Sequence, residues 1–351
     1  MTRNIRRRAL ILTTTIVAVA AGAACFEGLT APLPASRAVA VDSGAIGVWT
    51  DVSGSRVAWT AATIEGYAID VEDLATGRRW AFPPTAGATQ VDAPSVDGDR
   101  AVWMEFVPDS AWLFESRIVL ADLRGGSPVA ITNAEYEDQW PDISGDRVAW
   151  QRSDPASGTS RILVYDIPTG RTTVVPAGRV GESVDLQPSI SGDRVVFERL
   201  TYVSGAAHPL AEVMLYDLST GNLETLNPRA GSSQGGADIA GDIVAWLDVT
   251  DGAGHLVYED LATGRVVRVT GERARPNWPR VSGSRIVWED KRYGEQSDIY
   301  VYDLGTGKET RVTYDFSDQR RPVVSDGWLA WRDEGPPTRL MALKLPVGPT
   351  P

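Results

Sequence analysis

The stretch DISGDRVAW at residues 142–150 decides the fold, because variants of it occur seven times along the 351-residue chain. Each copy ends in an aromatic residue, and these residues follow one another at intervals of 42 to 49 positions. They are Trp59, Trp103, Trp150, Phe197, Trp246, Trp288 and Trp331. A regular period of this length predicts an array of similar structural units.

Each copy is followed by a second phrase, such as VYDIPTG at residues 164–170, with a degraded form LMALKL at 340–345. The SGDR turn supplies a glycine for a tight hairpin, and D-L-x-T-G supplies an Asp that can bond its own backbone. No helical periodicity separates the segments, so each repeat reads as four short strands. Both hairpins lie on one side, the hairpin face, and the longer connections lie on the opposite, long-loop face.

Units of four antiparallel strands and this length are typical of propeller blades. We therefore predict an all-β fold, a seven-bladed β-propeller of four-stranded antiparallel blades over residues 37–347, with the recurrent aromatics packed between blades. The last repeat lacks a clear fourth strand. The apolar segment RAVAV at residues 37–41 is predicted to supply it, so that an N-terminal strand closes the ring.

The N-terminal residues 1–24 have the basic start, apolar stretch and small residues of a secretory signal. Cys25, the only cysteine, stands where a bacterial lipoprotein signal places its acylated cysteine. Lipidation of Cys25 and ordinary cleavage after residue 23 both stay open. Residues 25–36 read as a flexible tether and 348–351 as a tail. We predict an extracytoplasmic protein that is secreted, periplasmic or lipid-anchored, with no other membrane contact.

The formal charge of the chain is −12, and the first 24 residues contribute four arginines and no acid. A strongly acidic surface disfavours nucleic acid, whose phosphates require a basic face. We therefore expect no nucleic-acid partner.

The phrase P-x-I-S-G-D-R-V-x-W, followed by V-Y-D-L-x-T-G and R-V-T, resembles the TolB-like propeller repeat family over residues 37–346. The resemblance implies a β-propeller fold. It also implies a role as an assembly partner in the cell envelope, although the turn reads SGDR where the family has S-P-D-G.

Signals for catalysis are few. His208 and His255 fall in different repeats and cannot form a multi-histidine metal site, and no nucleophile motif occurs. The sequence therefore predicts no catalytic residue, metal or cofactor. An alternative, a propeller glycan hydrolase or lyase, would use carboxylates on the long-loop face. The available ones are Glu135, Glu137, Asp138, Glu182 and Asp185.

Positions that differ among repeats are the better guide to binding. Four residues before each turn serine, at the mouth of the channel, the repeats carry Trp49, Ala93, Trp140, Gln187, Gly236, Trp278 and Arg321. We predict a ligand site formed by Trp49, Trp140, Trp278, Gln187 and Arg321. Spread around the ring, they would surround a sugar ring or a peptide side chain. The alternative is that each Trp covers its own loop.

Three further sets of residues carry charge, each set occupying one equivalent position along the repeats, which we call a repeat column. The arginines that open the second strand, such as Arg56, and the Asp that ends the third, such as Asp73, are predicted to pair within a blade. Glu105 with Arg152, and Arg199 with Asp248, are predicted to pair between blades. On the innermost strand, Asp51, Asp142 and Asp238 raise the option of a channel cation, although Ser95, Ser189 and Val323 occupy alternate positions.

The leading functional hypothesis is an exported, non-enzymatic recognition or scaffold propeller. It would bind an envelope protein, a peptide or a glycan on its long-loop face. The propeller enzyme and the TolB-like assembly partner are the alternatives.

Overall fold

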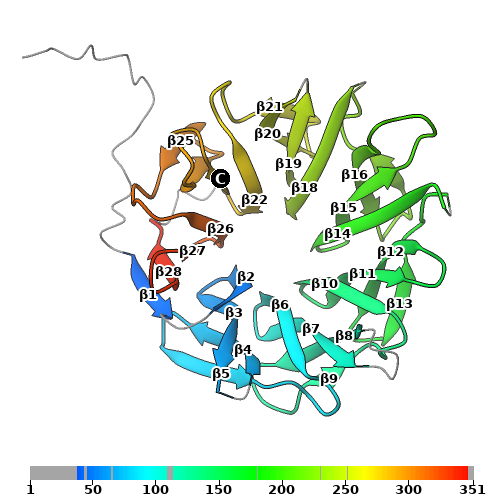
Figure 1. Cartoon of the computed structure of the whole chain (residues 1–351), viewed down its shortest axis with the longest axis vertical. Helices are drawn as coiled ribbons and strands as arrows, with labels where there is room; N and C mark the ends of the chain where they lie inside the picture. The colour runs from blue at the N-terminus through cyan, green and yellow to red at the C-terminus, as the bar shows by residue number, and fades with distance from the viewer. Residues whose placement is uncertain are drawn as a thin grey trace, which may run out of the picture.

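The structure is a computed structural model that describes residues 38–346 except 43–45, 65, 109–113, 180, 230 and 251. The described residues form strands and turns, with no helix among them. Their sheets are arranged radially around a central axis (Figure 1). The predicted all-β class is confirmed. The predicted signal, Cys25, the tether and the tail lie outside the described residues.

The four strands of each repeat run outward from the axis. The innermost strands are β2 (Ile46–Ser53), β6 (Gln90–Asp97), β10 (Glu137–Ser144), β14 (Ser183–Ser191), β18 (Ser232–Ala240), β22 (Pro276–Ser282) and β26 (Gln319–Val324). The second strands are β3 (Arg56–Thr63), β7 (Arg100–Pro108), β11 (Arg147–Asp154), β15 (Arg194–Thr201), β19 (Ile243–Thr250), β23 (Arg285–Asp290) and β27 (Trp328–Asp333). The third strands are β4 (Gly66–Asp73), β8 (Phe114–Asp122), β12 (Thr159–Asp166), β16 (Leu210–Asp217), β20 (Ala253–Asp260), β24 (Asp298–Asp303) and β28 (Arg339–Lys344). The outer strands are β5 (Arg78–Phe82), β9 (Val129–Ala130), β13 (Arg171–Val174), β17 (Leu223–Thr225), β21 (Arg265–Arg268), β25 (Lys308–Arg311) and β1 (Val39–Asp42).

The described strands pair into five sheets of four strands and one sheet of eight. The larger sheet joins repeats 2 and 3 through a parallel bridge between Glu137 of β10 and Ser116 of β8. In the last repeat β1 is the outer strand, antiparallel to β28, with Val39 opposite Ala342. The segment that precedes the first repeat and the end of the last repeat therefore lie side by side in one sheet (Figure 1).

The recurrent aromatics form the core between neighbouring repeats, as predicted. All seven side chains are at most 2% exposed. Trp103 packs against Ile69 and Val71 of the preceding repeat, and Trp246 packs against Val213 in the same way. Burying side chains of this size supplies much of the favourable free energy of folding.

The two turn motifs behave as their residues predict. Gly145 in an SGDR turn and Gly170 in a D-x-x-T-G turn have φ of 57° and 66°, in the left-handed region that favours glycine. The Oδ1 atom of Asp73 accepts backbone N–H groups of Ala75 and Thr76 at 2.9 and 3.3 Å. The Asp therefore satisfies its own turn.

The predicted ion pairs within blades on the hairpin face are wrong. Four of the five second-strand arginines instead pair with the turn Asp of the next repeat, as in Arg56–Asp99 and Arg147–Asp193, both at 2.6 Å. The fifth, Arg285, donates to the backbone carbonyl oxygen of Asp326 in the next repeat. Because the third-strand Asp is already engaged by its own turn, the arginine finds a free carboxylate across the repeat boundary. The hairpin face is thus linked from repeat to repeat.

The predicted pairs between blades on the long-loop face are also wrong. Glu105 binds Arg117 of its own repeat at 3.0 Å, and Arg152 binds Asp138 of its own repeat at 2.7 Å. Arg199 likewise binds Asp185 at 2.7 Å. These carboxylates are almost fully buried, so a partner inside the same sheet is closer than any in the neighbouring repeat.

Candidate ligand site on the ring axis

A bulge interrupts each innermost strand near the long-loop end of the axis. In repeat 3 the pairing of β10 with β11 shifts between Gln139 and Asp142, and the other repeats shift at the equivalent place. Six bulge residues have a left-handed φ between 49° and 62°, which costs a non-glycine residue about 1–2 kcal/mol. These are Ala93, Trp140, Gln187, Gly236, Trp278 and Arg321. The same conformation occurs with different residues in six repeats, so it is a feature of the repeat backbone and not of any one side chain.

The bulges bring together four of the five predicted ligand residues in an aromatic cluster of Trp49, Trp140, Trp278 and Arg321. The Trp49 ring meets those of Trp140 and Trp278 edge to face, with centroids 4.5 and 5.3 Å apart. The expectation that the three rings would spread around a central ligand is wrong, because they contact one another. Gln187 lines the adjoining cavity outside this cluster.

Arg321 holds the cluster together electrostatically. Its guanidinium carbon lies 4.1 Å from the Trp49 ring centroid and 3.6 Å from that of Trp278, within cation–π range. Burial lowers the pKa of Arg321 to about 10, although the Glu289 carboxylate opposes this shift. Its Nη1 atom has no hydrogen-bond partner among the described residues. The aromatic faces therefore replace part of the hydration of this cation.

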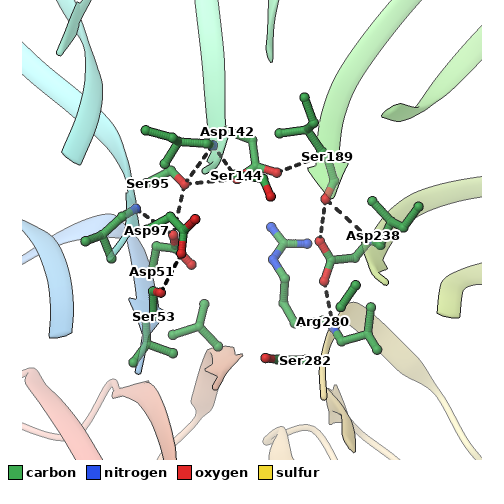
Figure 2. Close-up of a pocket in the computed structure, with 18 of the residues that line it drawn as sticks. Asp51, Ser53, Ser95, Asp97, Asp142, Ser144, Ser189, Asp238, Arg280 and Ser282 are labelled. Atoms are coloured by element: carbon green, nitrogen blue, oxygen red, sulfur yellow. Dashed lines mark hydrogen bonds between the residues drawn. The ribbon is translucent and has the colours of Figure 1, made fainter. Parts of the chain in front are cut away.

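Beside the cluster lies a cavity of about 280 Å³ on the axis, lined by the innermost strands. We call it the axial cavity. At its middle the repeats contribute Asp51, Ser95, Asp142, Ser189, Asp238, Arg280 and Val323. Figure 2 shows the Arg280 side chain pointing into the cavity, among these carboxylates. The cavity thus holds three carboxylates and one guanidinium at this level.

The aspartates and serines also join the innermost strands. An innermost strand has no neighbour on its axial side, so its N–H groups there need other acceptors. Asp142 Oδ2 accepts the N–H of Ile190 at 2.7 Å, and Asp238 Oδ2 accepts that of Val281 at 2.6 Å. Ser95 donates to Asp51 and Asp142 at 2.9 Å. Each carboxylate therefore links its strand to the next repeat.

The three aspartates carry an electrostatic cost. Burial raises the pKa of Asp142 to about 7, and the charges of Asp51 and Asp238 add to the rise. Burial also raises the pKa values of Asp51 and Asp238, whereas the Arg280 charge lowers both. Hydrogen bonds favour the ionised forms but do not offset the loss of hydration. A cationic group in the cavity would therefore stabilise the ionised forms of these carboxylates.

Small polar side chains border the hairpin end of the cavity. Ser53 donates to Asp97 at 2.9 Å, and Asp97 accepts the N–H of Gly145 at 2.6 Å. Ser144 and Ser191 take equivalent positions, in contrast to the large rings at the opposite end. This end therefore has more room for a ligand than the end filled by the aromatic cluster.

Metal-ligating side chains and loop carboxylates can be located in the described ranges. No group of three or more His, Cys, Asp or Glu side chains there is arranged to hold a metal ion. Of the loop carboxylates proposed for an enzyme, Asp138 and Asp185 are each held by two hydrogen bonds from an arginine. Over the same ranges, no helix is long and apolar enough to cross a membrane.

Arg280 is the site residue that sequence reasoning missed. It stands in the same repeat column as Asp51, Asp142 and Asp238, and it is the sole positive residue of that column. Comparing all seven repeats at this position would have found it. The contact between tryptophans, in contrast, depends on how closely the innermost strands approach the axis and has no local signal in the sequence.

Radial antiparallel sheets around an axial cavity define a β-propeller. Solved structures show the same fold. The β-propeller domain of the Trilobed protease from Pyrococcus furiosus matches 86% of this chain and 95% of its own at a TM-score of 0.64 and 14% identity. An oligogalacturonate lyase from Vibrio parahaemolyticus matches 85% and 89%, at a TM-score of 0.61 and 11% identity.

TolB from Acinetobacter baumannii also matches, over 83% of this chain and 79% of its own, at a TM-score of 0.48 and 17% identity. At these identities the likenesses show the fold alone. No protein-family profile matches the chain, and no curated protein matches its sequence.

Proposed function

We propose that this chain is an exported recognition propeller whose axial cavity binds a small basic group, such as the side chain of a lysine or arginine in an envelope protein or peptide. The single observation that carries the proposal is the charge of the cavity. Asp51, Asp142 and Asp238 face one guanidinium, that of Arg280, in a cavity that the innermost strands line. A bound cation would offset this excess.

The scaffold in this proposal is a closed ring of seven blades. The eight-stranded sheet then counts as two blades joined by one bridge, and β1 closes the ring by pairing with β28. A rigid ring supports recognition because it fixes the cavity walls before the ligand arrives. Export rests on the signal-like residues 1–24.

The volume and shape of the cavity favour a side chain over a larger ligand. At about 280 Å³ it is at the small end of ligand pockets. The aromatic cluster closes the long-loop end, so the ligand would enter from the hairpin face, between Ser53, Ser144 and Ser191. Its positive end would then lie near Asp142.

Calorimetric titration of the purified protein with N-acetyl-lysine amide, N-acetyl-arginine amide and N-acetyl-glutamine amide tests the proposal. The two basic compounds should bind, the neutral one should not, and Asp142→Asn should weaken binding by about tenfold or more. Asp146→Asn, an exposed turn residue on the hairpin face, is the matched control and should bind normally. Equal binding of all three compounds would overturn the proposal.

A second candidate, a glycan hydrolase or lyase, is favoured by one observation. A carboxyl group with a pKa of about 7, as at Asp142, suits general acid–base catalysis at neutral pH. The negative cavity disfavours a polyanionic substrate such as oligogalacturonate. Turnover of neutral and amino-sugar glycans that is lost in Asp142→Asn would support the enzyme, and absence of turnover would leave recognition as the function.

A further inference from the structure

Repeat 5 differs from its neighbours at the long-loop end of β19. In repeats 2, 3, 4 and 6 a buried carboxylate at this end is bound by an arginine of the same repeat. The pairs are Glu105–Arg117, Asp138–Arg152, Asp185–Arg199 and Asp290–Arg292, at 2.7 to 3.0 Å. In three of these repeats the carboxylate also accepts the indole N–H of the core tryptophan.

Over the part of the chain that the structure describes, no cation binds the corresponding carboxylate of repeat 5. Asp248 is 3% exposed, and its Oδ1 atom accepts the hydroxyls of Ser232 and Thr250 at 2.5 and 2.9 Å. Its Oδ2 atom has no hydrogen-bond partner among the described residues. The same holds for Trp246 Nε1 and His255 Nδ1, which are also buried. Three unsatisfied polar atoms thus gather in one repeat, and such groups are rare and costly in native proteins.

Asp248 and His255 line a cavity of about 390 Å³ at the outer part of repeat 5. Val257 and Val266 give it an apolar wall, and Arg268 at its rim is neutralised by Glu272 at 2.8 Å. Arg229, also at the rim, is exposed, so solvent screens its charge. The cavity therefore offers a buried carboxylate oxygen to an incoming group that donates hydrogen bonds.

We infer that this cavity is a second binding site, separate from the axial cavity, and that it takes the guanidinium of an arginine side chain from a peptide or protein partner. The neighbouring repeats show how such a group is held. In repeats 3 and 4 the guanidinium donates two parallel hydrogen bonds to the carboxylate, which is the geometry that arginine provides and lysine does not.

The pairing of β20 with β19 suggests a substitution that would place an arginine of the protein itself in this site. His255 lies opposite Asp248 in the pairing of β20 with β19, as Arg117 lies opposite Glu105 in repeat 2. In His255→Arg the new guanidinium should reach Asp248 as Arg117 reaches Glu105. The partner's arginine would then find the carboxylate occupied.

The test is a titration of the full chain with N-acetyl-arginine amide, followed by NMR at the Trp246 indole N–H, which is assigned by its loss in Trp246→Phe. The signal should shift and saturate, whereas the neutral isostere N-acetyl-citrulline amide should leave it unchanged. In wild type the His255 imidazole signals should move as well. His208, the other histidine and an exposed loop residue, is the internal control.

Two variants decide the outcome. Asp248→Asn should weaken the affinity for N-acetyl-arginine amide, measured at the Trp246 indole signal, by about tenfold or more. His255→Arg should abolish this binding and raise the unfolding temperature. Asp142→Asn, in the axial cavity, should leave this binding intact, which separates the two sites. The inference is overturned if wild type does not respond, if citrulline amide acts equally, or if His255→Arg binds as wild type does.

Discussion

The two faces of the propeller use the same types of charged residue in opposite ways. On the hairpin face Arg56, Arg100 and Arg147 reach carboxylates of the next repeat, whose side chains are 43 to 56% exposed. On the long-loop face Arg152 and Arg199 bind carboxylates of their own repeat that are at most 1% exposed. The hairpin face links neighbouring repeats through ion pairs that water screens. The long-loop face holds each sheet together through ion pairs that are buried.

The difference teaches where charge matters for stability. An exposed pair contributes little, because water screens both partners and the side chains lose entropy. A buried carboxylate that loses its partner is left without hydration or a counter-charge. Variants that break a pair on one face or the other should therefore differ by several kcal/mol in the free energy of unfolding, although the distances in the pairs are alike.

The largest effect should come at the junction of repeats 7 and 1. Trp328 and Ser55 stand there in place of the Arg and Asp that pair at most other junctions, and the strand β1 contributes buried contacts with repeat 1. Deleting residues 37–42 removes the buried Val41 and the acceptor of the Trp59 indole N–H, Asp42. We expect the free energy of unfolding, measured by chemical denaturation, to fall by about 4–6 kcal/mol. An unchanged unfolding midpoint would show that β1 does not hold the ring closed.

The next effect should come from the buried pair of repeat 3. Arg152→Met keeps an unbranched apolar stem in place of the aliphatic part of arginine but leaves Asp138 buried without a cation. We expect a destabilisation of about 3–5 kcal/mol. The double variant Arg152→Met/Asp138→Leu should recover part of this loss. If it does not, packing and not the unpaired charge accounts for the effect.

The axial cavity should produce a dependence on pH. Below about pH 4 Asp142 is protonated in both states. Between about pH 4 and 7 it ionises in the unfolded chain but keeps its proton in the folded one, so stability falls as pH rises. Each pKa unit is worth about 1.4 kcal/mol, so up to about 4 kcal/mol is lost by pH 7. Urea denaturation of Asp142→Asn should show a flatter profile, and identical slopes would refute the raised pKa.

The smallest effect should come from the hairpin face. Arg147→Met removes the exposed pair with Asp193, and we expect the free energy of unfolding to fall by less than about 1 kcal/mol. Adding about 0.5 M salt to the wild type should remove most of the same contribution, because salt screens exposed charges. A loss as large as that of Arg152→Met would break the distinction between the two faces.

Much of the fold could be predicted because the repeat columns are local. The aromatic within the second strand and the turn glycines each act within a few residues of their position. The hairpin-face pairs were missed although their signal is present. The arginine occurs in repeats 1, 2, 3, 4 and 6, and the turn Asp occurs in repeats 2, 3, 4, 5 and 7. That offset of one repeat matches the four ion pairs observed and the hydrogen bond from Arg285 to the backbone of Asp326.

The candidate site was predicted less completely. The positions of Trp49, Trp140 and Trp278 were identified from the repeat column, but their mutual contact depends on how far the bulges project across the ring. The three unsatisfied atoms of repeat 5 could not be predicted either. Whether Asp248 has a partner depends on side-chain directions, which the sequence does not specify.

The left-handed bulge has a consequence for how such a ring can change over evolution. Its conformational strain lies in the backbone and is shared by Ala93, Gln187 and Trp278 alike. Exchanging one side chain for another at this position therefore leaves the strain unchanged. Exchange at this position is limited instead by side-chain contacts, as among Trp49, Trp140, Trp278 and Arg321, so these four residues should change together whereas Ala93 and Gln187 can change singly without rebuilding the sheets.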